Sequence, residues 1–262
     1  MLLATALTGA KANELTVYDG TETSQYAPVW GRYMVWKQKC EIIMPATDLT
    51  AMTATDITGM TFYLKTPATV SWSDVTVKVY LREVTETYLD ANSGFVGIEG
   101  SQLVYQGGLD ATGSTMTIPF SNAYSYGGGN LLICIYKPSF EGTSNNTEVE
   151  FLGVEPVHVG CIQNGDYDEF DELGAVGRLF LPKTTFDYSP SSCQRPTEFT
   201  LDDVTPTQAT LSWESDADAW DIEVNGVVTS NITDKSYQID LTPLESYVVR
   251  VRTNCGGGST SA

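Results

Sequence analysis

Apolar and polar positions alternate along much of the chain. The clearest example is residues 74–84 (DVTVKVYLREV), where Val75, Val77, Val79 and Leu81 fall on one face and polar or charged residues fall on the other. A period of two is the spacing at which side chains of an extended strand return to the same face. This stretch is therefore predicted to be a strand with one face against a core.

Many other short segments show strand-like patterns, and helical periodicity is hard to find. The further strand candidates are 14–19, 39–44, 57–65, 102–107, 114–120, 130–137, 148–154 and 177–182. The separators are rich in glycine, asparagine and serine, which favour tight turns. Short strands joined by such turns predict an all-β fold with an antiparallel, jelly-roll-like β-sandwich over residues 13–188.

A second strand series follows a short polar segment that contains prolines, residues 189–195, which is predicted to be a linker. Alternation resumes in ATLSWES, AWDIEVNG, SYQIDL and YVVRVRT, between residues 209 and 253. Asn225 and Gly226 form a strong hairpin signal between two of these segments. Residues 196–262 are therefore predicted to be a second β-sandwich domain.

This second domain resembles a fibronectin type III domain. The resemblance rests on Pro196 with a phenylalanine three residues later, LSW at 211–213, and LTPLESYVVRV at 241–251. It implies an immunoglobulin-like sandwich in which Trp213 lies in the core and Tyr247 forms a tyrosine corner with Leu241. The family has one more strand after the glycine turn, so the resemblance implies an incomplete domain with further domains beyond Ala262; a natural ragged end is the alternative.

The position of two cysteines suggests a variant of this family that occurs in secreted proteins of the Bacteroidetes. The resemblance to this variant implies a disulfide between Cys193 and Cys255, and two free thiols are the alternative. The pairing of the other three cysteines, Cys40, Cys134 and Cys161, is left open. Residues 13–188 are similar to a β-sandwich domain of exported multidomain proteins in the same bacteria, a resemblance that implies no activity.

The ends and the charge of the chain bear on its location. MLLATALTGAKA, residues 1–12, resembles the end of a secretory signal peptide with a small-x-small pattern at Ala10 and Ala12; an N-terminal strand is the alternative. The formal net charge of −19 argues against nucleic acid and anionic membranes as partners. No segment is apolar and long enough for membrane insertion. A secreted or cell-surface protein is the prediction.

Catalytic motifs are hard to find. His158 is the single histidine, and metalloprotease, phosphate-loop and hydrolase-elbow motifs are missing. A glycosidase-type pattern begins at Glu169 and Asp171, but Gly174 stands where its last carboxylate would be. The chain is predicted not to be an enzyme, and a glycan-active enzyme with carboxylates scattered in sequence is a distant alternative.

Two groups of residues are candidate binding sites. Sugars stack on flat aromatic side chains, so Trp30, Tyr33, Trp36 and Trp72 are candidate ligand-binding residues, with core packing as the alternative.

Asp166, Asp168 and Asp171 offer closely spaced oxygen ligands for calcium, although their spacing differs from an EF-hand; a solvated acidic loop is the alternative.

These observations predict a non-catalytic extracellular module for adhesion or carbohydrate binding, part of a larger surface protein. Its partner would be a glycan or a cell-surface protein, and its only predicted cofactor would be calcium. The main alternative is a structural spacer that presents another domain. The sequence leaves the identity of the ligand and the oligomeric state open.

Overall fold

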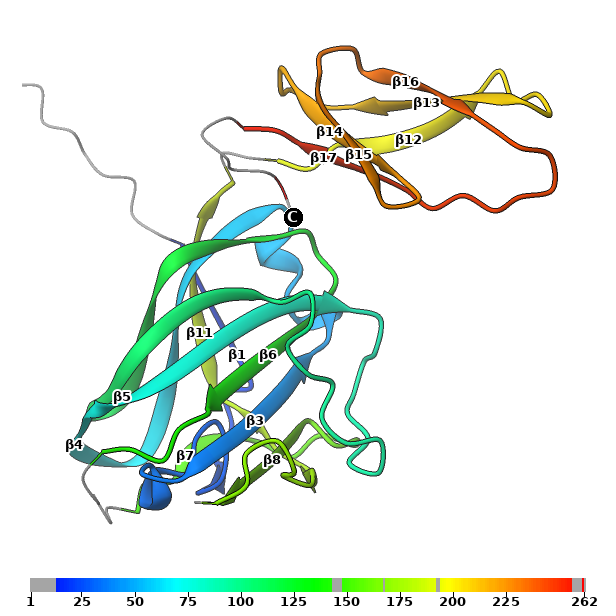
Figure 1. The fold of residues 1–262 in the computed structure, drawn as a ribbon. Helices are drawn as coiled ribbons and strands as arrows, with labels where there is room; N and C mark the ends of the chain where they lie inside the picture. The colour runs from blue at the N-terminus through cyan, green and yellow to red at the C-terminus, as the bar shows by residue number, and fades with distance from the viewer. Residues whose placement is uncertain (1–12, 143–147, 167, 192–193, 256–260, 262) are drawn as a thin grey trace, which may run out of the picture. The chain divides into compact units, whose positions relative to one another are not determined.

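A computed structural model describes residues 13–142, 148–166, 168–191, 194–255 and 261 (Figure 1). Strands account for nearly all of the regular structure, and they pair antiparallel, so the predicted all-β fold class is confirmed. The only helical pieces among these residues are three 3₁₀ turns, η1 (Gly31–Tyr33), η2 (Ala46–Asp48) and η3 (Thr50–Met52). The chain divides into two compact units: one takes in most residues up to 189, and the other runs from 190 onward and includes 53–56 and 125–127.

The first unit is built from eleven strands, of which two are very long. They are β1 (Asn13–Val17), β2 (Glu22–Ser24), β3 (Lys37–Met44), β4 (Thr55–Val84), β5 (Gln102–Tyr126), β6 (Asn130–Lys137), β7 (Phe151–Val154), β8 (Cys161–Asp166), β9 (Val176–Arg178), β10 (Leu181–Pro182) and β11 (Thr184–Pro190). The main path of the sheet is β1-β11-β4-β6-β3-β8-β9, while β5 pairs with β4, and β7 pairs with β2, β4 and β10.

The long strands β4 and β5 curl strongly, as the cyan and green ribbons of Figure 1 show. The sequence predicted two separate strands within each of them, and this prediction was wrong because the chain bends there without reversing. One end of β4 pairs with β6 through residues 78–84, whereas Leu64 pairs with Phe151 of β7. A single strand therefore contributes to both layers of the sandwich.

The alternation at 74–84 is confirmed, since Val75, Val77, Val79 and Leu81 are all buried. On β3 and β6, in contrast, both faces are buried, which explains the nearly unbroken apolar sequence of β6. The outer face carries a second hydrophobic cluster in which Ile43, Leu132 and Tyr136 pack against side chains of the connections on either side, including Phe95 and Phe170.

The second unit forms two three-stranded sheets. Its strands are β12 (Thr197–Asp202), β13 (Gln208–Glu214), β14 (Trp220–Val224), β15 (Val227–Ile232), β16 (Ser236–Asp240) and β17 (Val249–Thr253), in the orders β12-β13-β16 and β15-β14-β17. Its core holds Trp213 and Trp220 edge to face, with ring centroids 5.7 Å apart. The Tyr247 hydroxyl accepts a hydrogen bond from the Thr242 amide at 2.7 Å.

Some predictions fall on residues outside the described part of the chain. These are the proposed signal-peptide remnant at 1–12 and Cys193, so its predicted bridge to Cys255 stays a prediction. Cys40, Cys134 and Cys161 are buried free thiols. Across the described residues, no helix has the length and apolar character needed to cross a membrane.

Candidate functional site

Four aromatic side chains gather between β2 and β3, in what we call the aromatic segment, residues 26–36. The rings of Tyr33 and Trp36 stack with centroids 4.2 Å apart, and Trp30 meets Tyr33 edge to face at 4.6 Å. Tyr26 lies edge to face on Trp30 at 5.4 Å. All four side chains are half-buried. Three of the four sequence-predicted aromatic residues therefore lie together, and Tyr26 joins them.

The backbone of this segment is compact rather than extended. A cis peptide bond joins Ala27 to Pro28, and the 3₁₀ turn η1 follows. At the start of the segment, the Ser24 hydroxyl accepts hydrogen bonds from the amides of Tyr26 and Ala27 at 3.1 and 3.3 Å. A polar side chain that bonds the backbone two or three residues onward favours such a turn over a continuing strand. This turn brings the four rings into contact.

Gln38 on β3 holds the middle of the aromatic segment. Its side-chain oxygen accepts from the Trp30 amide at 3.0 Å, and its side-chain nitrogen donates to the Trp30 and Tyr33 carbonyls at 3.1 and 2.7 Å. The Gln38 side chain is buried, with an exposed fraction of 6% for the residue. Because a buried amide left without partners is costly, these bonds fix the turn strongly.

Lys137, the last residue of β6, holds the end of the same segment. Its ammonium group donates to the carbonyls of Val35, at 3.1 Å, and Ser139. The residue is only 2% exposed. Burial lowers the pKa of the Lys137 ammonium to about 8, although the negative charges of Glu141 and Asp74 act in the opposite direction. Two buried polar side chains from neighbouring strands therefore hold the aromatic segment.

The fourth predicted aromatic residue, Trp72, does not belong to this surface. It lies on β4 and is 1% exposed, so no face of its ring is available to a ligand. The indole packs beneath η1, where a Cβ added at Gly31 would come within 2.9 Å of it. The prediction of Trp72 as a ligand-binding residue was wrong because this tryptophan supports the segment from inside the sandwich.

A polar groove of about 280 Å³ adjoins the aromatic segment and shares Tyr26 with it. The residues that line the groove come from β2, β9 and the neighbouring turns: Glu22, Thr23, Ser24, Gln25, Tyr26, Glu150, Arg178, Leu179 and Phe180. The guanidinium carbon of Arg178 lies 4.0 Å from the centre of the Tyr26 ring. Sequence analysis missed Arg178 because it is about 150 residues from Tyr26 and belongs to no motif.

One carboxylate of the groove is already engaged. Glu150 pairs with the Lys65 ammonium at 2.7 Å and accepts from the Thr23 hydroxyl at 3.3 Å. The hydrogen bond from Lys65 is the largest cause that holds the pKa of Glu150 below its usual value. The groove thus combines an aromatic wall with a neutralised carboxylate and an arginine, a mixture suited to a ligand with both apolar and polar faces.

The acidic loop, residues 166–171, does not assemble an ion site among its described residues. No three His, Cys, Asp or Glu side chains of the described chain are close enough to hold a metal ion. The Asp166 carboxylate instead accepts from the Asp168 amide at 2.9 Å, and both residues are exposed, as is Asp171. Residue 167 is not described. Calcium binding here stays a prediction for which these carboxylates are not preorganised.

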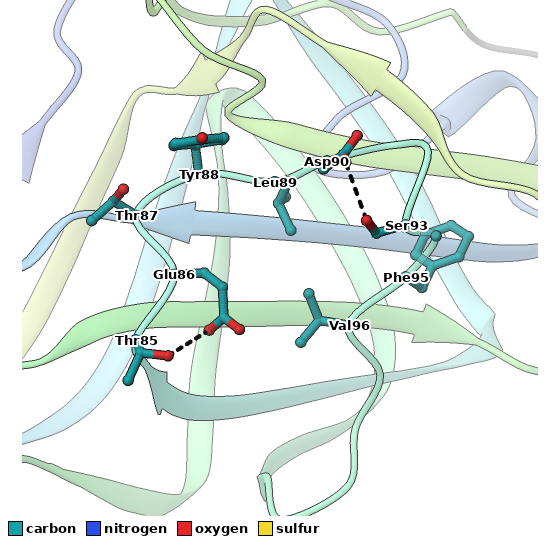
Figure 2. A pocket seen from close by; sticks show the side chains of 10 residues that line it. Thr85, Glu86, Thr87, Tyr88, Leu89, Asp90, Ser93, Phe95 and Val96 are labelled. Atoms are coloured by element: carbon teal, nitrogen blue, oxygen red, sulfur yellow. Dashed lines mark hydrogen bonds between the residues drawn. The ribbon is translucent and has the colours of Figure 1, made fainter.

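A second cavity of about 440 Å³, between β4 and β5, is lined by residues 85–90 and 93–96. Figure 2 shows Leu89 and Val96 at its wall, beside the carboxylate of Glu86. The loop is anchored from beneath by the fully buried carboxylate of Glu41, which accepts from the amides of Val96 and Gly97 at 2.6 and 2.9 Å. This cavity has an apolar wall, but none of its lining residues belongs to a sequence-predicted site.

The single histidine takes a surface position. His158 is exposed, and its ring stacks on that of Tyr88 with centroids 4.5 Å apart. Tyr88 also lines the second cavity.

The comparisons with known proteins add no family to these observations. No family model matches the chain, and a search of curated proteins finds no match.

Proposed function

We propose that this protein is a non-catalytic extracellular module that binds carbohydrate through the aromatic segment and the adjoining polar groove. The observation that carries the proposal is the fixed geometry of half-exposed aromatic rings. The backbone of Trp30 and Tyr33 is held by three hydrogen bonds with the Gln38 side chain, which accepts one and donates two. A surface that is ordered before binding loses little conformational entropy when a ligand arrives.

The chemistry of this surface suits a sugar. The C–H faces of a pyranose ring are apolar and pack on flat indole and phenol rings, while its hydroxyls need donors and acceptors at the edge of the site. Tyr26 provides a ring next to the groove, and Gln25 and Glu150 provide polar atoms along it. Clustered aromatic rings and a polar groove on one surface support carbohydrate over an extended apolar ligand.

The location and modular organisation form part of the same proposal. An exported protein whose second domain is of the fibronectin type III variant with paired cysteines would carry a disulfide between Cys193 and Cys255. The three remaining cysteines are free and buried, which supports this pairing as the one available within the chain. A thiol titration of the protein, unfolded in denaturant without a reducing agent, tests the bridge. With the disulfide in place, three of the five cysteines react; a count of five would contradict the bridge.

The proposal is tested on a glycan array with the full chain and a Trp30→Ala/Trp36→Ala variant. The matched control is Tyr88→Ala, which removes an exposed aromatic ring outside the aromatic segment. We expect the wild type and the control to bind the same glycans, and the double variant to lose them. Circular dichroism and thermal unfolding verify that the variants are folded.

Three other results would change the proposed function or the proposed site. A folded wild-type protein that binds no glycan would contradict the proposal and favour a spacer or a protein-binding adhesin. Binding that the double variant retains would remove the aromatic segment as the site. Binding lost on chelation of calcium, with the double variant unaffected, would move the site to the acidic loop.

A further inference from the structure

We infer that the polar groove selects acidic saccharides, and that Arg178 binds their carboxylate or sulfate group. This inference rests on the proposed carbohydrate binding and specifies the class of ligand at the same site. It follows from the contacts of Arg178, from the state of the carboxylates beside it, and from the geometry of the guanidinium group.

Arg178 differs from other arginines of the protein in having no protein acceptor. Its side chain makes no ion pair and no hydrogen bond to any residue that the structure describes, and its Nε atom is buried without a partner. By contrast, Arg250 pairs with Glu223 at 2.6 Å, and Arg32 pairs with Glu148 at 3.4 Å. In a chain with 33 acidic residues, an arginine that lines a groove without a carboxylate partner has unused capacity to bind an anion.

The contact that holds Arg178 leaves its donors available. The guanidinium carbon lies 4.0 Å from the centre of the Tyr26 ring, a distance typical of a cation–π contact. Such a contact uses the face of the planar group, whereas hydrogen bonds to an anion use the N–H groups at its edge. The same arginine can therefore rest on Tyr26 and bind a ligand.

The acidic residues of the groove do not cancel this preference. Glu150 is neutralised by Lys65 at 2.7 Å. Glu22, on β2, is exposed to solvent, where its charge is screened. Both carboxylates can accept hydrogen bonds from sugar hydroxyls, while Arg178 is the only cationic side chain among the residues that line the groove.

The geometry of guanidinium matches the anions that sugars carry. Its parallel N–H groups bind the two oxygens of a carboxylate or two oxygens of a sulfate ester at once. A uronic acid and a sulfated sugar present these groups beside the apolar face of the ring. The groove, at about 280 Å³, is of a size to take one such residue, while the aromatic segment contacts its neighbours in the saccharide.

The test measures the affinity of the full chain for three saccharides by isothermal titration calorimetry. The probes are tetragalacturonate, a sulfated heparin-derived tetrasaccharide and neutral galactotetraose. We expect at least one acidic probe to bind more tightly than the neutral one, and its identity distinguishes carboxylate from sulfate recognition. Arg178→Met should lower the ratio of acidic to neutral affinity by about tenfold, since hydrogen bonds to charged groups are worth roughly that much.

Two further variants separate the role of the anion from a structural role. Arg178→Lys keeps the charge but loses the planar fork, so it should recover part of the acidic preference. Arg250→Met is the matched control: it removes an arginine of the second unit that pairs with Glu223 at 2.6 Å, and should change neither affinity.

Equal affinity for acidic and neutral probes would overturn the inference and leave the proposed function standing. The failure of all saccharides, together with a blank array, would contradict both. If Arg178→Met proves unfolded, the comparison between the wild type and the folded Arg178→Lys variant tests the inference. An Arg178→Lys variant with the same ratio of acidic to neutral affinity as the wild type would overturn the role of Arg178.

Discussion

The aromatic segment and the acidic loop at 166–171 both connect strands of the first unit and both carry side chains of a binding type. Their backbones are held in different ways. Gln38 and Lys137, each buried on a strand, donate to carbonyls of the aromatic segment. In the acidic loop, the Asp166 carboxylate bonds the loop's own backbone at Asp168, and the donor from β3, the Lys37 ammonium, reaches the Asp168 carbonyl in an exposed hydrogen bond of 2.6 Å.

This difference concerns how firmly each cluster is held before a ligand binds. Buried donors from rigid strands fix the position of a backbone and leave the side chains of that segment free to bind. A carboxylate that satisfies its own loop is less available to a ligand, and an exposed loop pays an ordering cost when an ion arrives. Substitutions at each of these hydrogen bonds test this difference.

The largest effect is expected from Gln38→Ala. It leaves the Trp30 amide without its partner and removes one of the two hydrogen bonds at each of the Trp30 and Tyr33 carbonyls, so the free energy of unfolding should fall by about 2–4 kcal/mol. Urea unfolding measures it. Gln163→Ala is the matched control, because Gln163 is similarly buried on β8 and makes no hydrogen bond to the aromatic segment. An equal loss in both variants would contradict the anchoring role of Gln38.

A smaller, pH-dependent effect is expected from Lys137. Because burial lowers the pKa of its folded-state ammonium to about 8 from 10.5, the unfolded chain binds the extra proton between these values. The free-energy cost of burying the charged Lys137 ammonium is fully present below pH 8, and it is relieved as the pH rises toward 10.5. From pH 7 to 9.5 the contribution of Lys137 to stability should therefore increase by about 2 kcal/mol.

Other groups also titrate in this range, so the quantity to measure is a difference. The free energies of unfolding of the wild type and Lys137→Met are compared at pH 7 and pH 9.5. We expect the free energy of unfolding of the wild type to increase relative to that of Lys137→Met as the pH rises. A constant difference would show that Lys137 has an ordinary pKa and is not confined as described.

The smallest effect is expected in the acidic loop. Asp166→Ala removes one exposed hydrogen bond to Asp168 and should cost only about 0.5 kcal/mol. Addition of millimolar calcium should leave the thermal midpoint unchanged, because the described carboxylates do not converge. A rise in the midpoint that Asp166→Ala abolishes would restore the calcium site predicted from the sequence.

The sequence and the structure agree where local pattern determines the outcome. Alternation placed the strand at 74–84 correctly, and residue type singled out Trp30, Tyr33 and Trp36, whose contact with one another only the structure shows. Trp72 could not be separated from them by residue type alone, since an indole serves equally as a core side chain and as a binding surface.

Long-range partners were the part that sequence could not supply. Arg178 meets Tyr26 only because β9 continues the sheet next to β8, and Gln38 reaches Trp30 only because the chain turns at η1. Neither contact has a local signature. The lengths of β4 and β5 were missed for a similar reason, since a bend in a strand and a turn between strands have similar composition.

We propose that the aromatic segment is a preformed carbohydrate-binding surface. Affinity electrophoresis tests this with the full chain, Trp36→Ala and Tyr88→Ala, in gels that each contain one soluble polysaccharide, acidic or neutral. We expect at least one polysaccharide to retard the wild type and Tyr88→Ala, and folded Trp36→Ala to migrate as in an empty gel. Equal retardation of all three proteins, or retardation of none, would contradict it.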